Sequence, residues 1–143
     1  MGKNKRRFAG QSKKPNIFAG QAAAAPEKGP TEFCVSLKHF DSSQGQSFEH
    51  WEQAGFLSKL LERWRAQSSK PMLQCFDKKF HRYGEFPLKS GFRHPRHVPP
   101  DAVWASMHIQ SKECVGGHVI GNVFYVVFLD CDHKFWPVEK KNT

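Results

Sequence analysis

The dipeptide Gly121-Asn122 constrains the fold most strongly, because it separates two runs of β-branched and aromatic residues in the last third of the chain. Dipeptides of this kind favour the two-residue turns that join antiparallel strands. We therefore predict a β-hairpin over residues 114–130. The turn sets a register in which Ile120 faces Val123 and His118 faces Tyr125.

This register divides the hairpin into two faces. The first holds Val115, Val119, Phe124, Val126 and Phe128, and the second holds Cys114, Gly116, His118, Tyr125, Val127 and Leu129. A preceding strand, Val103–Ile109, places Met107 opposite Val115 and His108 opposite Cys114 through a three-residue connection. Its residues Val103, Ala105, Met107 and Ile109 join the first face, whereas Trp104, Ser106 and His108 join the second. This register follows from the length of the connecting loop alone. The separation of apolar from polar residues that results favours the same register.

Two further patterns complete the predicted fold. Residues 33–37 alternate as a half-buried strand does, and apolar residues at spacings of three and four predict a helix from Phe48 to Ala66. Gly55 weakens that helix by about 1 kcal/mol without having to end it. A short second helix is predicted over Met72–Phe80. The fold class is α+β: an N-terminal strand and one or two helices pack on a small antiparallel sheet formed mainly by the C-terminal meander.

Charge and composition divide the chain into a tail and a domain. Residues 1–30 hold seven of the 22 lysines and arginines and one of the 13 acidic residues, without hydrophobic periodicity, so we expect a disordered basic tail. Residues 31–143 form a single predicted domain. Four prolines argue against regular structure in the basic segment 83–101, which we predict to be a long loop.

The net charge of +9 favours a polyanionic partner, and RNA is the partner that we expect. A basic tail that serves only solubility is the competing interpretation. RNA cleavage without a metal needs a base for the 2′-hydroxyl, a cation for the phosphate and an acid for the leaving oxygen, and histidine suits both proton-transfer roles. The candidate catalytic residues are His133, His118 and His108. The candidate nucleic-acid-binding residues are Arg93, His94, Arg96, His97, Lys112, Lys134, Tyr125 and Trp136.

The predicted order of elements resembles the RelE/ParE-like toxin superfamily, many of whose members are ribonucleases that cut messenger RNA. The resemblance rests on the helix Phe48–Ala66, the strand Val103–Ile109, the hairpin Cys114–Asp130 and the closing Asp132-His133-Lys134-Phe135. It implies a toxin-like endoribonuclease, possible association with ribosomes, an antitoxin-like protein partner and a role for His133, which follows the last strand. The long loop 83–101 and the basic tail depart from the family pattern.

Other classes of function have weaker support in the sequence. The cysteine and histidine pairs lack the spacing of a structural zinc site, although a composite site of Cys131, His118 and His133 stays open. We expect no metal and no cofactor, because phosphate-binding and nucleophile-elbow motifs are absent. The lack of a long apolar run or a secretory signal predicts a cytoplasmic protein without a membrane partner. Two alternatives remain: a non-catalytic nucleic-acid or ribonucleoprotein-binding module, and a protein-interaction domain that uses the repeated Phe-Ala-Gly-Gln segments at 8–11 and 18–21.

Overall fold

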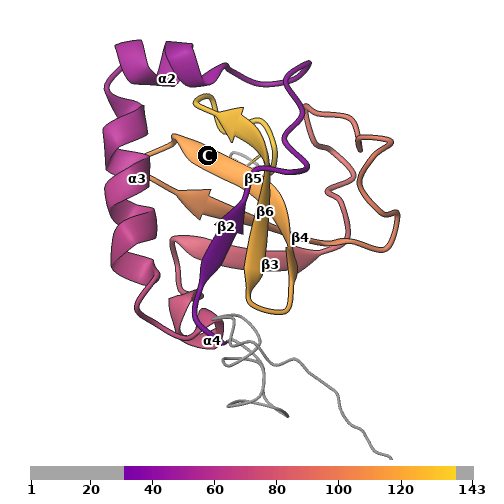
Figure 1. The fold of residues 1–143 in the computed structure, drawn as a ribbon. Helices are drawn as coiled ribbons and strands as arrows, with labels where there is room; N and C mark the ends of the chain where they lie inside the picture. Colours follow the sequence, from indigo (N-terminus) through magenta and orange to yellow (C-terminus); the bar gives the residue numbers. More distant parts are fainter. Residues whose placement is uncertain (1–30, 138–143) are drawn as a thin grey trace, which may run out of the picture. The chain divides into compact units, whose positions relative to one another are not determined.

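The computed structural model describes residues 31–137, so the predicted tail and its two Phe-Ala-Gly-Gln segments lie outside the described residues. Figure 1 shows the elements of this range. They are β2 (Cys34–Ser36), α2 (Phe48–Gln53), α3 (Phe56–Gln67), α4 (Met72–Cys75), β3 (Phe80–Gly84), β4 (Val103–His108), β5 (Cys114–Ile120) and β6 (Val123–Asp130). Within this range, none of the helices has the length and apolar character needed to cross a membrane.

The five strands form one sheet in the order β2-β6-β5-β4-β3. Strands β3 to β6 pair antiparallel, whereas β2 runs parallel to β6 at one edge. The α+β class is thus confirmed, and the C-terminal meander is antiparallel as predicted, but β2 makes the whole sheet mixed. The connection through the helices is the reason, because it returns the chain to the opposite edge of the sheet as β3. After the three antiparallel pairings that follow, β6 runs in the same direction as β2.

The predicted hairpin register is confirmed near the turn, where Ile120 pairs with Val123 and His118 pairs with Tyr125. A β-bulge between Gly116 and Gly117 then inserts one extra residue, Val127, into β6. Consequently Val115 pairs with Leu129 instead of Phe128. Leu129 therefore packs toward the helices and Phe128 toward the opposite side, the reverse of the predicted faces.

The predicted single helix Phe48–Ala66 is wrong, because Gly55 divides it into α2 and α3. Ser47 caps α2 by accepting a hydrogen bond from the backbone N–H of His50 at 3.0 Å. Gly55 has a φ of 84°, in the left-handed region that ends a helix, and it is also the N-cap of α3.

The predicted helix Met72–Phe80 is also too long, since α4 ends at Cys75. The carboxylate of Asp77 accepts hydrogen bonds from the backbone N–H groups of Lys79 and Phe80 at 2.8 and 2.9 Å, and this turn starts β3. The segment predicted as a loop from residue 83 therefore begins with the end of β3. The irregular connection between β3 and β4 consists of residues 85–102.

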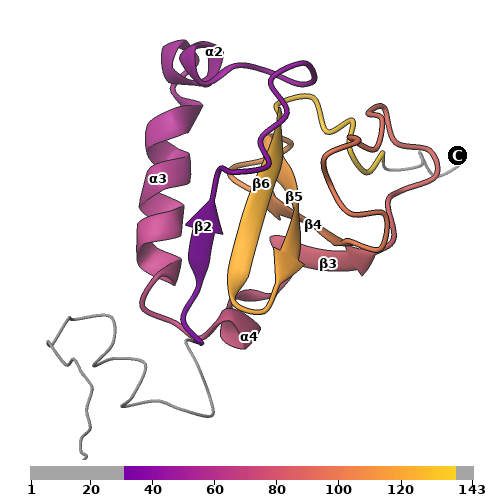
Figure 2. The ribbon, with the colours of Figure 1, turned by 45° about the vertical axis from the view of Figure 1, so that its right-hand side comes forward.

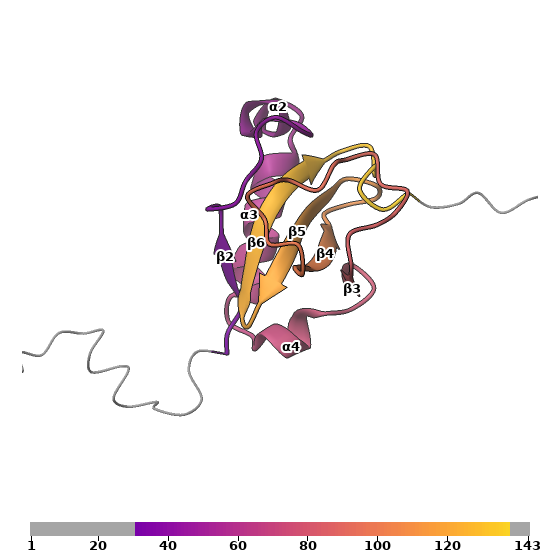
Figure 3. The ribbon, with the colours of Figure 1, turned by 90° about the vertical axis from the view of Figure 1, so that its right-hand side faces the viewer.

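Both faces of the sheet are covered. On one face, Trp51, Leu60 and Trp64 of α2 and α3 pack against the sheet in the first core (Figure 2). On the other face, the loop 85–102 and the segment 131–137 lie over the strands (Figure 3). They bury a second core of Val98, Trp104, Val127, Phe128 and Phe135. The second face is therefore open to solvent only near its borders. Of the predicted side chains on this face, those near a border can contact a substrate.

Candidate active site and phosphate-binding surface

Two of the three predicted catalytic histidines lie in direct contact. His108 is the last residue of β4, and His133 follows β6. Their Nε2 atoms are 3.0 Å apart, and both side chains are half-buried. At this distance one imidazole donates its proton to the other, which is the geometry of a donor and an acceptor of protons side by side.

The position of His133 depends on the buried carboxylate of Asp130 at the end of β6. This carboxylate accepts hydrogen bonds from the backbone N–H groups of Lys134 at 2.9 Å and Phe135 at 2.7 Å. The Cys114 thiol donates to the same carboxylate at 3.6 Å. The tight turn thus formed leaves His133 at a φ of 62°, the one positive φ at a non-glycine residue among those described. Such backbone strain costs about 1–3 kcal/mol and persists where the surroundings fix it, often at functional sites.

Burial lowers the pKa of His108 below its ordinary value of 6.5, and the positive charges of His133, Lys79 and Arg63 lower it further. The carboxylate of Asp130 opposes this shift without reversing it. His108 is therefore mainly neutral at pH 7. Neutral His108 keeps one unprotonated ring nitrogen, which a general base requires once the hydrogen bond to His133 opens.

Cationic side chains lie around this pair. The Nζ of Lys112 is 4.0 Å from Oδ1 of Asp132, and both side chains are at least half exposed. Lys134 is exposed, and its backbone carbonyl accepts a hydrogen bond from Gly91 at 2.7 Å. The Nε of Arg63 is buried and makes no hydrogen bond within the described residues. These groups give the site the positive charge that a phosphate requires.

His118 lies apart from the other two candidates and has no access to solvent. Its Nε2 contacts Nδ1 of His39 at 2.9 Å, and both rings stack with Tyr125. Burial lowers the pKa of His118 to about 4, and the positive charges of His39, His94 and His97 act in the same direction. It is therefore neutral at pH 7 and enclosed. The composite metal site with Cys131 and His133 is not assembled, and residues 31–137 contain no group of three or more candidate metal ligands.

A second polar site, the basic pocket, has a volume of about 470 Å³. It is lined by Asp41, Ser43, Gln44, Arg93, His94, Pro95, Arg96 and His97. Its shape is fixed by the Gln44 side chain, which donates to the carbonyl oxygen of Arg93 at 2.9 Å and accepts from the N–H of Arg93 at 2.8 Å. Arg93 and Arg96 form no ion pair within the described range, so both guanidinium groups can bind a phosphate.

The other predicted residues of this pocket have structural partners. His97 Nε2 donates to the carbonyl oxygen of His39 at 2.8 Å, and His94 Nδ1 donates to that of Pro95 at 2.9 Å. Burial opposes the ionised form of Asp41, but hydrogen bonds from Gln44 and Ser43 outweigh it and hold the pKa of Asp41 below its ordinary value. The pocket therefore combines one carboxylate with two available arginines.

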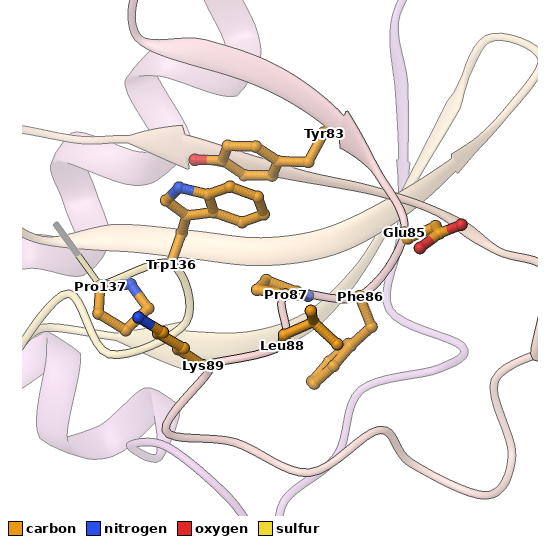
Figure 4. A pocket seen from close by; sticks show the side chains of 8 residues that line it. All are labelled: Tyr83, Glu85, Phe86, Pro87, Leu88, Lys89, Trp136 and Pro137. Carbon is orange, nitrogen blue, oxygen red and sulfur yellow. The ribbon is translucent and has the colours of Figure 1, made fainter. Parts of the chain in front are cut away.

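Of the two aromatic residues among the predicted nucleic-acid-binding residues, Tyr125 stacks with His39 and His118, whereas Trp136 borders an open groove of about 680 Å³. Figure 4 shows this groove, which we call the Trp136 groove; it is lined by Tyr83, Glu85, Phe86, Pro87, Leu88, Lys89, Trp136 and Pro137. The sequence interpretation missed Tyr83, His39 and Asp130. An acidic residue at the end of a strand, just before Cys131-Asp132-His133, was the available signal for Asp130.

Comparisons with protein-family models, with curated proteins and with solved structures gave no match to this chain.

Proposed function

We propose that this protein is a metal-independent endoribonuclease in which His108 and His133 carry out proton transfer. The observation that carries the proposal is the 3.0 Å contact between the two Nε2 atoms, at a half-buried site beside exposed lysines. A histidine pair of this kind supplies a base and an acid together, which is the requirement for cleavage of an RNA chain by its own 2′-hydroxyl.

In the proposed reaction, bound RNA breaks the hydrogen bond between the two imidazoles, and neutral His108 then takes the proton from a ribose 2′-hydroxyl. The 2′-oxygen then forms a bond to the adjacent phosphorus, and the bond from phosphorus to the 5′-oxygen of the next nucleotide breaks. His133, in its doubly protonated imidazolium form, donates one proton to that leaving oxygen and becomes neutral. The products are a 2′,3′-cyclic phosphate and a 5′-hydroxyl end, and no water or metal enters the step.

Positive charge near the pair stabilises the transition state, in which charge accumulates on the phosphate oxygens. Lys112 and Lys134 are exposed cations of neighbouring segments, and Arg63 and Lys79 are close enough to His108 for their charges to lower its pKa. Arg93 and Arg96 in the basic pocket bind a further phosphate of the same RNA. A single-stranded substrate fits this division of labour, because its backbone can follow cations that lie apart.

The test is cleavage of a single-stranded RNA by purified protein and by the variants His108→Ala and His133→Ala. Each variant should lose about 10²- to 10⁴-fold in kcat, the usual contribution of a general acid or base. The matched control is His50→Ala, which removes an exposed histidine of α2. In the parent protein kcat/KM should fall as the pH drops through the lowered pKa of His108, which lies below the ordinary 6.5, because protonated His108 is no longer a base. Undiminished cleavage by both variants would refute the mechanism.

A non-catalytic RNA-binding protein is the second candidate, and Arg93 and Arg96, which form no ion pair within residues 31–137, favour it. Under this alternative, purified protein binds RNA without cleaving it, and removal of residues 1–30 weakens binding strongly while the folded domain persists. Under the nuclease proposal, the same deletion spares most of the activity. Deletion and cleavage assays on the same preparation therefore distinguish the two candidates.

The resemblance to RelE/ParE-like toxins extends the proposal to messenger RNA as substrate, to the cytoplasm, to ribosomes and to an antitoxin-like protein partner. The order of a strand, helices and an antiparallel meander in the described chain supports this extension. Co-expression offers the test: the protein alone should arrest growth of a bacterial host, and His133→Ala should relieve the arrest.

A further inference from the structure

Tyr83 and Trp136 form a parallel stack with one face left open. Their ring centroids are 3.8 Å apart and their planes differ by 3°. Tyr83 covers one face of the indole, and the other face borders the Trp136 groove (Figure 4). Trp136 keeps 37% of its surface exposed. A stacked pair with an open outer face is a platform for a third planar ring.

One side-chain contact links this platform to β4, the strand that ends at His108. The hydroxyl of Tyr83 is 2.8 Å from the hydroxyl of Ser106 in β4. Ser106 and His108 are two residues apart on the same strand, so they share a face and lie about 7 Å apart. Trp136 follows His133 by only three residues. The segment between them is held by the hydrogen bonds to Asp130 and by the buried side chain of Phe135. The groove therefore lies beside the site proposed for cleavage.

The walls of the groove suit a base better than an extended peptide. Pro87, Leu88 and Pro137 offer apolar contacts opposite the indole, while Glu85 and Lys89 bring polar groups to its border. A nucleobase combines an apolar face with a polar edge, and base–aromatic stacking tolerates any base. The net charge of +9 also favours an anionic chain over a neutral one.

We propose that the Trp136 groove binds an unpaired nucleobase of the RNA, stacked on the open face of Trp136 next to the scissile phosphate. The inference rests on the proposed nuclease function, since it names the substrate contact of that same site. The bound base extends the stack of Tyr83 and Trp136, and this contact places the neighbouring ribose against the histidine pair.

The intrinsic fluorescence of the protein reports on this contact. Of the four tryptophans, Trp51, Trp64 and Trp104 are buried, so a base in the groove quenches mainly Trp136. The probe is a single-stranded DNA decamer, which lacks the 2′-hydroxyl and cannot be cleaved. Trp136→Ala should abolish the quenching and raise Kd by about 5- to 150-fold. Trp136→Phe should recover most of the affinity, because it keeps a stacking ring.

Kd for the variants is measured by anisotropy of a labelled decamer, which does not depend on tryptophan. Leu73→Ala is the control, because it truncates an exposed leucine of α4 that does not line the groove. A second variant, Leu88→Asp, places a negative charge at a fully exposed position of the groove and should weaken binding without loss of folding.

The outcomes separate the two proposals. RNA cleavage by the parent protein, together with unchanged Kd and KM in Trp136→Ala and Leu88→Asp, overturns the base-binding groove and keeps the nuclease. Quenching and weakened binding as expected, with no cleavage by the parent protein, keep the groove and overturn the nuclease. Quenching by a proline-rich decapeptide, with none by the DNA decamer, assigns the groove to a protein partner and overturns the inference.

Discussion

At the scale of single residues, Asp130 shows how one buried carboxylate can organise a reactive segment. An isolated buried charge costs several kcal/mol, and hydrogen bonds from charged or polar partners offset that cost. Here two backbone N–H groups and the Cys114 thiol supply them. Burial raises the pKa of that thiol and the charge of Asp130 raises it further, so the thiol remains a donor. The turn that carries His133 therefore depends on the charge of one residue.

Substitution of Asp130 by asparagine should disrupt this turn. The amide group keeps one acceptor but presents an NH₂ to a backbone N–H, so we expect a loss of about 2–4 kcal/mol in the free energy of unfolding. Asp132→Asn is the matched control, since its exposed ion pair with Lys112 contributes less than about 1 kcal/mol. Urea unfolding of both variants measures the difference, and equal losses would contradict the role of Asp130.

His118 should make stability depend on pH. Its pKa is about 4 in the folded protein and near 6.5 when unfolded, so the unfolded chain binds more protons between these values. The free energy of unfolding should therefore decrease as the pH falls from 6.5 to 4, by about 3 kcal/mol from this residue.

Urea unfolding at several pH values measures the slope. His118→Gln removes the titrating group and should flatten the slope, although the variant is less stable at pH 7. His108 contributes a slope of the same sign, because its pKa is also lowered. A variant slope equal to that of the parent protein would argue against a neutral, buried His118.

The sequence could predict part of the candidate site and not the rest. Strand periodicity placed His108 on the second face, and the end of the hairpin placed His133 near it. The same periodicity placed His118 on that face, but it carries no information about which segment covers the face. Val98 and Phe135 come from irregular segments, so no periodicity indicated that they would enclose the neighbouring strands.

At the scale of elements, two glycines constrain the chain for different reasons. Gly55 has a positive φ and nothing within 4 Å of where a Cβ would lie. A Cβ on Gly117 would lie 2.9 Å from a ring carbon of Phe124 and closer still to the carbonyl oxygen of Tyr125. A side chain at position 55 would therefore strain the backbone dihedral angles, whereas a side chain at position 117 would clash with neighbouring atoms.

The two alanine substitutions should therefore differ in their cost. Gly55→Ala should reduce the free energy of unfolding by about 1–2 kcal/mol, the cost of a left-handed backbone at a residue with a Cβ. Gly117→Ala should cost about 3 kcal/mol or more, because the strands at the bulge must move apart. Thermal unfolding of the pair provides the measurement, and a more stable Gly117→Ala than Gly55→Ala would contradict it.

Elements with local signals were predicted well, and those set by distant contacts were not. The turn at Gly121-Asn122 gave the correct pairing of β5 with β6 as far as the bulge. The adjacent Gly116 and Gly117 indicated an irregularity but not its register. Strand β3 was missed because its residues form a strand by pairing with β4, which lies 19 residues further along the chain.

At the scale of the whole molecule, positive charge determines how the protein binds RNA under the proposed function. Neutralisation of phosphates releases counterions, so the logarithm of the binding constant falls linearly with the logarithm of salt concentration. The slope is about −0.7 for each phosphate of a single strand that is neutralised. Arg93 and Arg96 are the cations of the basic pocket with guanidinium groups available for this contact.

The double variant Arg93→Gln/Arg96→Gln should therefore reduce the magnitude of the slope by about 1.4. Arg65→Gln is the control for a single lost charge, because Arg65 is held by Glu62 on the exposed side of α3 at 2.8 Å. Titrations of an RNA oligonucleotide between 50 and 300 mM salt (on the order of the physiological range) measure both slopes. A double variant with the parent slope would exclude the pocket from the binding surface.

The parallel pairing of β2 with β6 also determines when the molecule can become complete. Strand β2 cannot join the sheet before β6 has formed, because β6 lies between β2 and β5. On a translating ribosome, the sheet cannot close until residue 130 has been synthesised and has left the exit tunnel. His133 and Trp136 emerge later still. Under the proposed function, RNA cleavage by the histidine pair therefore begins only after β6 has joined the sheet.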